Sequence, residues 1–408
     1  MCQDNMCTSP EEAVARLLTA IPFTLSTQVV NLDDALGRVA AQDICAPFNH
    51  PPFDRSPLDG YAAKAADTAG ACRETPAILK VVGEIFAGMS PAPRLQPGEA
   101  IRIMTGAPIP AGADCVIRQE DTDYGSNTVR VYVAHKPFQN YCHQGEDVRQ
   151  GACCISCGTM LDFSAIGVLA LLGQATISVF SRPTVGLLTT GSELVEVGMP
   201  LTAGKIYNSN QHLLSARMRE LGALPRVLPK CADDPDCIAK AISCALDDCQ
   251  FLVTTGGVSV GKKDFMPEVC HLLDGRLLFQ GIPIKPGAPA MAFQCKGKLV
   301  LCLSGNPFAA AATFELLARP VIMRLQGQSI SPAQFATAVL QTPFSKASPG
   351  RRFLRAYLQG GKVYLPEGGM EAHSSGALFS MMGCNCMIDI PAGTPCLSVG
   401  QEVNVILL

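Results

Sequence analysis

The sequence lacks the features that mark membrane-spanning, secreted and nucleic-acid-binding proteins. No apolar run reaches the ~18 residues that a membrane span needs, and residues 1–9 are polar, unlike the basic start and apolar core of a secretory signal. The formal net charge is −3, which argues against a broad basic face for nucleic acid. We therefore expect a cytoplasmic protein that binds neither membranes nor nucleic acids.

Recognisable metal-binding patterns are also scarce. The six histidines include no H-E-x-x-H pair. Nineteen cysteines are many, but a cytosolic chain keeps most of its thiols reduced. Cys153, Cys154 and Cys157 are close enough in sequence to suggest a metal site, as are Cys384 and Cys386, yet neither group has a second pair at zinc-ribbon spacing. We therefore interpret most of the cysteines as small buried hydrophobic residues.

What the sequence does contain is an alternation of strand and helix patterns from residue 184 onward. With 408 residues, of which 48% are hydrophobic and 16% charged, the chain is long enough for roughly two to four domains. The alternation predicts a doubly wound parallel sheet with helices on both faces. The strands are expected at residues 184–189, 225–228, 251–255 and 298–303, and the helices at 209–221, 235–246 and 308–325.

The rest of the chain predicts an α-rich domain and two β domains. Ser9, Pro10 and Glu12 have the pattern of a helix start, and further helices are expected at residues 31–39 and 163–173. Short strands separated by proline and glycine turns are expected at residues 81–89, 100–104, 115–119 and 128–134, and again at 334–340, 352–358, 362–365, 386–390 and 401–407. The fold class is therefore multidomain α/β, with a linker domain (8–45 plus 146–180), an inserted β domain (46–145), a central α/β domain (181–327) and a C-terminal β domain (328–408).

Three strands of the predicted α/β domain end in glycine turns that carry polar residues, at positions 190–191, 255–257 and 303–307. The carboxyl ends of parallel strands share one edge of a sheet, and open α/β sheets bind ligands there. Glycine turns expose backbone N–H groups, and Lys285 lies in a proline-rich segment that limits its freedom, so we expect an anionic ligand. The alternative for Lys285 is an ordinary solvated lysine.

The turn after residues 251–255 matches the phosphate-loop motif incompletely. Gly256, Gly261 and Lys262 fit most of that pattern, but Lys263 stands where the motif requires a magnesium-binding hydroxyl. The turn also lacks the G-x-G-x-x-G spacing of a dinucleotide-binding fold. A tight turn that needs glycine only for its shape is a further interpretation.

Residues 257–261 also fit the nucleophile elbow of serine hydrolases, with Ser259 as the nucleophile. That chemistry needs a later acid and a histidine, and the candidates are His373 with Glu315 or Glu367. A serine hydrolase is therefore kept as an alternative.

Two further regions place charged residues where either a ligand or ordinary structure could use them. The proline-rich loop 46–61 holds Asp59, whose Asp-Gly pair is also a common turn signal. Three arginines within residues 351–355 suit phosphate through forked hydrogen bonds, or they are the solvated face of an edge strand.

Many ordered segments resemble the molybdopterin molybdenumtransferase family, of the MoeA and gephyrin C-terminal domain type. The resemblance runs through most of the chain, and the family's domain order agrees with the one predicted above. The segments that carry it are residues 52–54, 59–62, 102–108, 145–147, 190–191, 204–208, 255–261, 284–287 and 305–307.

The resemblance implies insertion of molybdate, or tungstate, into adenylylated molybdopterin with release of AMP. It also implies an elongated homodimer in which the inserted β domain of one chain completes the site of the other. Mg²⁺ would be held on the substrate phosphates by acidic groups. An adenylyltransferase and molybdoenzymes are the expected partners.

The site residues follow from the strand-end turns together with the resemblance. Catalysis is assigned to Asp59, Glu193, Asp264 and Lys285, and metal binding to Glu193, Asp233, Asp234 and Asp264. Of the family positions, Asp59 and Thr105 would come from the partner's inserted domain. Substrate binding is assigned to Thr105, Asp147, Thr190, Gly191, Gly256, Gly257, Ser259, Gly261, Pro286, Gly305, Asn306, Pro307, Arg351 and Ser375.

Several positions depart from the family pattern, and most of the differences remove positive charge. Because charged hydrogen bonds contribute about 1.5–3 kcal/mol each, such losses weaken anion binding by orders of magnitude. A non-catalytic paralogue that holds molybdopterin is therefore an alternative, and adenylyl transfer to molybdopterin is another within the family. Basic residues of the family are replaced by Cys142, His143, Gln144, Gly281 and Ala288, and two further differences are Ser192 and Ser304.

Overall fold

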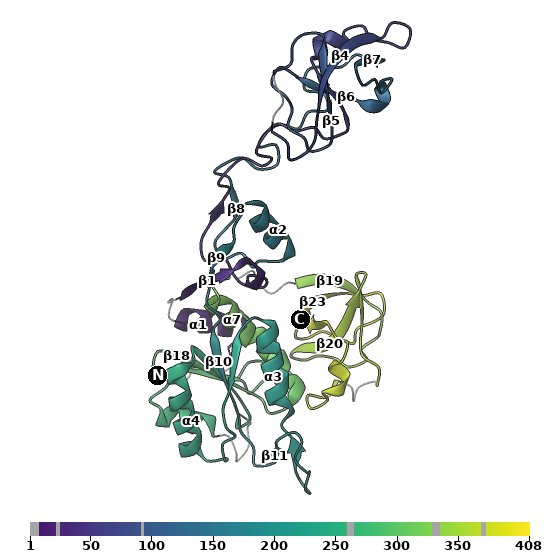
Figure 1. The fold of residues 1–408 in the computed structure, drawn as a ribbon. Helices are drawn as coiled ribbons and strands as arrows, with labels where there is room; N and C mark the ends of the chain where they lie inside the picture. The colour runs from purple at the N-terminus through teal and green to yellow at the C-terminus, as the bar shows by residue number, and fades with distance from the viewer. Residues whose placement is uncertain (1–7, 22–24, 91–93, 259–264, 329–334, 369–372) are drawn as a thin grey trace. The chain divides into compact units, whose positions relative to one another are not determined.

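The computed structural model describes residues 8–21, 25–90, 94–258, 265–328, 335–368 and 373–408 (Figure 1). The chain divides into two compact units. The first contains residues 1–42, 157–166 and 176–408, and the second contains residues 43–156 and 167–175. The finer division into four domains stays a prediction.

The core of the first unit is a six-stranded sheet in the order β13-β10-β14-β18-β17-β15. Its four parallel strands are β10 (Thr184–Thr189), β13 (Leu224–Val227), β14 (Phe251–Thr255) and β18 (Lys298–Leu303), which confirms the predicted strands within one residue. Two strands that the sequence analysis missed, β17 (Met291–Cys295) and β15 (Arg276–Gln280), add antiparallel pairs at one edge. The chain runs outward from β10 to β13 and then returns to β14, so strand order reverses between β10 and β14.

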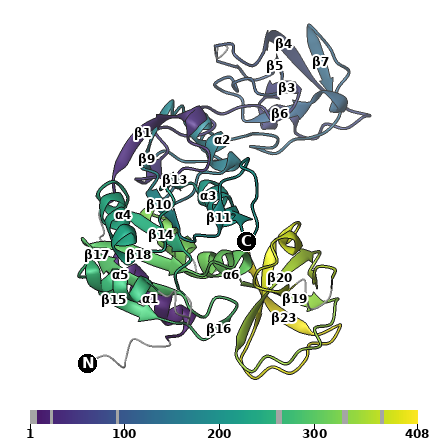
Figure 2. The same ribbon diagram turned by 90° about the horizontal axis from the view of Figure 1, so that it is seen from below.

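Both faces of this sheet are covered, as a doubly wound sheet requires. Along β14, Phe251 and Val253 belong to one apolar cluster and Leu252 to another, because alternate residues of a strand point to opposite faces. Four helices contribute residues to the first cluster, namely α1 (Pro10–Ala20), α3 (Ser209–Glu220), α6 (Pro307–Thr313) and α7 (Arg319–Leu325). Two helices contribute to the second, namely α4 (Pro235–Asp248) and α5 (Met266–Leu272). Figure 2 shows α6 between the central sheet and the C-terminal β strands.

The helix start predicted at residue 9 is confirmed. The Ser9 hydroxyl accepts a hydrogen bond from the Glu12 N–H at 3.1 Å, and Pro10 occupies the first turn of α1. The single helix predicted over 308–325 is interrupted instead by a π-helical stretch, Phe314–Ala318. Pro320 explains the interruption, because a proline has no N–H to donate to the preceding turn.

The C-terminal strands close into a barrel. The strands are β19 (Phe335–Leu340), β20 (Arg351–Gln359), β21 (Lys362–Tyr364), β22 (Cys386–Ile390) and β23 (Glu402–Leu407), which confirms the predicted C-terminal β module. Closure follows because β22 pairs with both β23 and β20. A short strand from the central domain, β16 (Ile284–Lys285), pairs in parallel with the start of β20.

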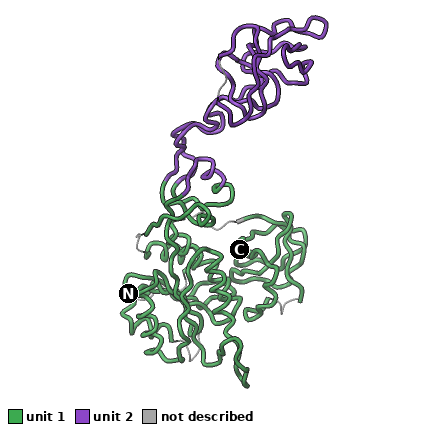
Figure 3. Tube along the Cα trace, in the orientation of Figure 1, with its two compact units in different colours: residues 1–42, 157–166, 176–408 green, residues 43–156, 167–175 purple. Residues whose placement is uncertain are grey.

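The second unit, purple in Figure 3, contains the small β sheet that the sequence analysis expected, while the domain bounds 46–145 stay a prediction. Its five-stranded sheet has the order β6-β3-β5-β4-β7. A separate pair is formed by β2 (Ile44–Cys45) and β8 (Cys153–Ile155). The sheet strands are β3 (Gly60–Ala63), β4 (Ala77–Ile85), β5 (Glu99–Ile103), β6 (Cys115–Arg118) and β7 (Thr128–Val131).

One predicted helix is wrong. Residues 31–39 contain only a 3₁₀ turn, Leu32–Asp34, which follows β1 (Thr27–Asn31). The β1 strand pairs with β9 (Thr176–Phe180), a partner far away in sequence. The helix predicted at 163–173 is present as α2 (Phe163–Leu171). No helix within the described ranges is long and apolar enough to span a bilayer.

Candidate active site

A cavity of about 960 Å³ lies at the carboxyl ends of the central parallel strands. The turns that follow β10, β14 and β18 all contribute to its wall. It therefore occupies the position where open α/β sheets bind ligands, at the reversal of strand order. Ten of the predicted site residues line it, namely Thr190, Glu193, Gly256, Gly257, Lys285, Pro286, Gly305, Asn306, Pro307 and Ser375.

Backbone hydrogen bonds between the strand ends shape the floor of the cavity. The Thr190 N–H donates to the Thr255 carbonyl at 3.0 Å, and the Gly256 N–H donates to the Leu303 carbonyl at 3.1 Å. Gly256 has φ +93°, and a Cβ there would lie 2.6 Å from the Thr190 carbonyl oxygen and 2.7 Å from its hydroxyl. Only glycine fits this position, because both the conformation and the space exclude a side chain.

The carboxylate of Glu193 folds back over Gly191. A Cβ on Gly191, whose φ is +145°, would lie 2.6 Å from Glu193 Oε1. Glu193 is exposed and lines the cavity, whereas Gly191 is buried beside it. The positive φ of Gly191 favours glycine here, and the Glu193 carboxylate occupies the space beside it.

Asparagines at the start of α3 are site residues that the sequence analysis missed. Asn208 caps α3 by accepting from the Gln211 N–H at 3.3 Å, and its amide donates to Thr189 Oγ1 at 2.8 Å. Asn210 is 8% exposed, and its amide donates to the Gly305 carbonyl at 2.8 Å. The family-like segment 204–208 was a signal that this region belongs to the site.

The amide oxygen of Asn210 is an unsatisfied acceptor at the cavity. It is buried, and no described residue donates a hydrogen bond to it. Asn210 also lines the cavity. An orphaned buried acceptor costs free energy unless a ligand supplies a donor, so Asn210 has the properties of a ligand-binding residue.

Lys285 is the only lysine or arginine among the described residues that line the cavity. It is exposed, and it follows Ile284 in β16, which pairs with β20 through the register Ile284–Arg351 and Lys285–Arg352. Gly287, with φ +100°, brings the same loop against the side chain of Thr313. The Lys285 loop is thus held between the C-terminal barrel and α6.

A loop of the C-terminal module, residues 374–380, forms another wall through Ser375, Gly376 and Leu378. The fully buried Arg355 holds this loop. Its guanidinium donates to the Ser374 carbonyl at 2.6 Å, to Ser380 Oγ at 2.7 Å and to the Ala377 carbonyl.

The same guanidinium connects the loop to α6. It lies 3.6 Å from the centroid of the Phe308 ring, and the Phe308 N–H donates to the Ser375 carbonyl at 3.0 Å. Burial lowers the pKa of Arg355 to about 10, so it stays protonated at neutral pH. We infer that Arg355 is a positioning residue for this wall.

Besides Gly191, three described residues of the first unit that were predicted for the site do not line the cavity. Arg351 is paired with Asp389 at 2.9 and 2.7 Å and also with Glu11, which engages its forked donors. Asp233 accepts from the Ser192 N–H at 3.1 Å, and Asp234 caps α4. Their assignment to substrate and metal stays a prediction. Ser259, Gly261 and Asp264 lie outside the described residues.

The acidic lining of the cavity decides whether the site fits Mg²⁺, and the described lining contains one acid, Glu193. Among the described residues, no group of three histidine, cysteine or acidic side chains is placed to hold a metal. Because Mg²⁺ usually keeps several waters and takes only one or two carboxylates beside substrate phosphates, Glu193 fits such an ion.

The second unit has its own hollow, of about 540 Å³, which Asp59 and Thr105 line together with Arg118 and Asn140. Asp59 Oδ1 accepts from the Thr105 N–H and from its hydroxyl, both at 2.7 Å. These two hydrogen bonds hold the pKa of Asp59 below its usual value, so the carboxylate stays charged. Asp147, also in this unit, is exposed.

Residues 142–144, where the sequence analysis expected family basic residues to be missing, pack against neighbours within the second unit. Tyr141 donates to Asp54 Oδ2 at 2.6 Å, and the Gln144 N–H donates to Asp54 Oδ1 at 2.8 Å. The His143 ring lies 4.7 Å from the Tyr141 ring, and Cys142 is buried. Aromatic packing and hydrogen bonds therefore hold this segment in place.

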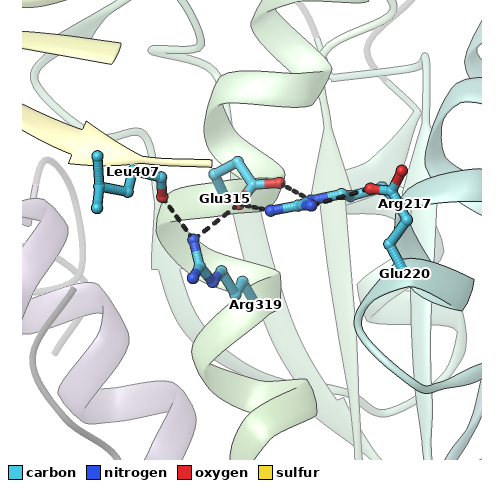
Figure 4. A network of polar contacts seen from close by, with 5 residues as sticks. All are labelled: Arg217, Glu220, Glu315, Arg319 and Leu407. Atoms are coloured by element: carbon cyan, nitrogen blue, oxygen red, sulfur yellow. Dashed lines mark hydrogen bonds and ion pairs between the residues drawn. The ribbon is translucent and has the colours of Figure 1, made fainter. Parts of the chain in front are cut away.

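The acids and histidine considered for a serine hydrolase do not meet at the cavity. Glu315 is buried and binds Arg217 at 2.6 and 3.1 Å and Arg319 at 3.4 Å, as Figure 4 shows. Arg319 also donates to the Leu407 carbonyl at 2.7 Å, which connects α7 to β23. His373 lines a different cavity, of about 410 Å³, with Glu367.

The Arg217 side chain stabilises this network further. Burial alone would lower the pKa of Arg217, but the hydrogen bonds and charges of Glu315 and Glu220 outweigh burial and raise it. Glu315 is therefore a structural acid that joins α3, the π-helical stretch and α7 (Figure 4).

Comparison with known proteins agrees with this architecture. Family models described as the MoeA N-terminal region (domain I and II), a probable molybdopterin binding domain and the MoeA C-terminal region (domain IV) match residues 8–173, 186–324 and 337–408. A crystal structure of the molybdopterin biosynthesis MoeA protein from Pyrococcus horikoshii OT3 is similar, with a TM-score of 0.86, 30% identity and coverage of 98% of this chain and 100% of that one.

Two curated relatives match along nearly the whole chain. A molybdopterin molybdenumtransferase of Bacillus subtilis is 38% identical over 388 residues, which are 94% of this chain and 90% of the relative. One of Staphylococcus epidermidis is 35% identical over 402 residues, which are 98% and 95% of the two chains. The chain therefore belongs to the MoeA family of molybdopterin molybdenumtransferases, enzymes that insert molybdenum into molybdopterin during molybdenum cofactor biosynthesis.

Proposed function

We propose that the strand-end cavity binds adenylylated molybdopterin and molybdate, or tungstate, and that the reaction releases AMP. The observation that carries this proposal is the convergence of three strand-end turns, the Lys285 ammonium and the Glu193 carboxylate on one cavity. Backbone N–H groups and a lysine suit the pyrophosphate of such a substrate. A cavity of about 960 Å³ is large enough for a nucleotide-sized ligand.

The predicted site residues that line the cavity have the following roles in this proposal. Lys285 would neutralise phosphate charge, and the turn at 255–257 would present backbone N–H groups to it. Thr190, Pro286, Gly305, Asn306, Pro307 and Ser375 would shape the remaining surface. Mg²⁺ held by Glu193 and the substrate phosphates would make the phosphoanhydride easier to cleave. Asp233, Asp234 and Asp264 are the further acids proposed for that ion.

We further propose that the active form is a homodimer with shared sites. Asp59 and Thr105 would reach the cavity of the partner chain. Asp147 would also line the shared site. Support comes from the hydrogen bonds that keep Asp59 charged on a hollow of the second unit. The four-domain division, the cytoplasmic location and the adenylyltransferase and molybdoenzyme partners are parts of the same proposal.

The test is AMP release by the purified full-length protein with adenylylated molybdopterin, molybdate and Mg²⁺. Glu193→Gln should lower the rate at least about a hundredfold, because charge stabilisation at the reacting phosphate is lost. Lys285→Met should raise KM about ten- to a hundredfold, since it removes one charged hydrogen bond.

Lys296→Met is the matched control. Lys296 pairs with Asp247 on an exposed surface and does not line the cavity, so its loss should leave AMP release unchanged. Parental rates and KM values in both Glu193→Gln and Lys285→Met would contradict the proposed roles.

A further inference from the structure

Two cysteines face each other on the strand pair β2–β8. The register pairs Cys45 with Cys153 in an antiparallel ladder. In the adjacent pair, the Ala46 N–H donates to the Ala152 carbonyl at 2.9 Å. The register shifts between Ile44 and Cys45, so the ladder is irregular on its other side, but Cys45 and Cys153 are direct Cα partners.

That position suits a disulfide. Directly opposed Cα atoms of an antiparallel pair are about 4.5–5.5 Å apart, and this range is within the spacing that disulfides span. Opposed residues of a ladder point to the same face, whereas Cys154 is the extra residue at the register shift and has no Cα partner on β2. The Cys154 thiol is directed to the Ala152 carbonyl, at 3.5 Å, and the Cys153 thiol lies 3.7 Å from the Ile155 carbonyl.

Both thiols are accessible and close to each other. Cys45 and Cys153 are free and exposed, unlike the buried pair Cys270 and Cys295 in the first unit. Although Cys45 is exposed as a residue, partial desolvation of its thiol, followed by the charge and the hydrogen bond of Cys153, raises the pKa of the Cys45 thiol. The influence of Cys153 on this pKa is a second sign that the two sulfurs are neighbours.

We propose that Cys45 and Cys153 are an oxidative modification site, at which a peroxide-class oxidant forms a reversible disulfide across β2 and β8. The second unit begins at Asp43 and its long segment ends at Ser156, so these strands are where the chain enters and leaves that segment. The bond would therefore close a covalent loop around the whole five-stranded sheet.

The chemistry balances with one peroxide per disulfide. One thiolate attacks a peroxide oxygen, the O–O bond breaks, and a sulfenic acid and hydroxide form. The second thiolate then attacks the sulfenic sulfur, the S–S bond forms and a second hydroxide leaves. The two thiol protons convert the hydroxides to water, so two thiols and H₂O₂ yield one disulfide and two waters. A dithiol reductant reverses the step.

The test uses the full-length protein and hydrogen peroxide. After oxidation, alkylation and tryptic digestion, mass spectrometry should detect the peptide containing Cys45 joined to the peptide containing Cys153. The bond should raise the melting temperature of the oxidised protein, because it constrains the unfolded chain. Dithiothreitol should reverse both changes.

Three serine variants localise the bond. Cys45→Ser and Cys153→Ser should each abolish the joined peptide, whereas Cys154→Ser should leave its yield unchanged. Absence of the joined peptide in the parent would overturn the proposal, as would its persistence in Cys153→Ser through another cysteine. If a serine variant does not fold, peroxide protection of Cys45 and Cys153 against alkylation in the parent decides the same question.

Discussion

The floor and the C-terminal wall of the active-site cavity are built by different means. The floor consists of strand-end turns that backbone hydrogen bonds fix in place, with a glycine where no Cβ fits. The wall, residues 374–380, depends on the side chain of one buried arginine and on the ring beneath it. We infer that the floor tolerates no side chain at its closest contact, whereas the wall can be loosened in steps.

The largest effect is expected from Gly256→Ala, at the floor. Positive φ costs a non-glycine residue about 1–2 kcal/mol, and overpacking against the Thr190 carbonyl adds about 1–3 kcal/mol. The turn must shift, so AMP release should fall at least about a hundredfold. Urea unfolding and AMP assays measure the two consequences.

Gly297→Ala is the control for backbone strain alone. Gly297 has φ +71° in the turn between β17 and β18, and nothing lies within 4 Å of an added Cβ. It should lose about 1–2 kcal/mol of stability and keep its KM. Equal losses of activity in Gly256→Ala and Gly297→Ala would contradict a specific effect of the steric contact at Gly256.

The next effect is expected from Arg355→Met, at the wall. The change removes three hydrogen bonds, so the free energy of unfolding should fall by about 2–4 kcal/mol. KM should rise about tenfold or more as the loop loses its anchor, with kcat less affected. Arg355→Lys should rescue KM in part.

Arg226→Met is the matched control for Arg355→Met. Arg226 is a half-buried arginine of β13 that pairs with Asp248, and it does not line the cavity. Its KM should equal that of the parent. A wall variant that loses stability but keeps the parental KM would show that Arg355 does not position the loop.

A smaller effect on substrate binding is expected from Asn210→Leu, at a residue that lines the cavity. The orphaned Asn210 acceptor gains a partner only from a ligand, so its loss should weaken substrate binding about tenfold. Stability should change by less than about 1 kcal/mol, because an unsatisfied group is removed together with one hydrogen bond. Isothermal titration and urea unfolding provide the two values.

Ser215→Ala is the matched control on the same helix. Ser215 is buried, its hydroxyl has no partner among the described residues, and it does not line the cavity. Substrate affinity should be unchanged. Equal losses of affinity in both variants would contradict a ligand contact at Asn210.

The smallest effect at neutral pH is expected from His373→Gln, which should change how the stability of the protein depends on pH. Burial, and then the charges of Arg355 and Arg352, lower the pKa of His373 from 6.5 to about 4. Between these values the unfolded chain binds a proton that the folded chain does not, so stability should fall as pH falls from 6.5 toward 4. The melting temperature of His373→Gln should show a weaker dependence over that range. Identical pH profiles would contradict this role.

Local sequence patterns predicted most of the elements and part of the site. The apolar run 251–255 followed by two glycines has few alternatives to a buried strand and a turn, and the structure has both. Alternation along the chain predicted four parallel strands, and parallel order alone implies that their ends meet. Glu193 could be found in this way, whereas the assignment of Lys285 depends on its proline-rich segment and the family resemblance.

Only the tertiary structure decided which distant segments meet. The strands β15 and β17, the pairing of β1 with β9 and the pairing of the Lys285 strand with β20 all depend on partners that local patterns do not specify. Arg351 and Arg355 lie on one strand with similar sequence surroundings, yet one pairs with acids and the other anchors a cavity wall. The sequence by itself determines the elements, because turns and periodicity act over few residues. Burial and long-range hydrogen bonds assign side-chain roles, and these exist only after folding.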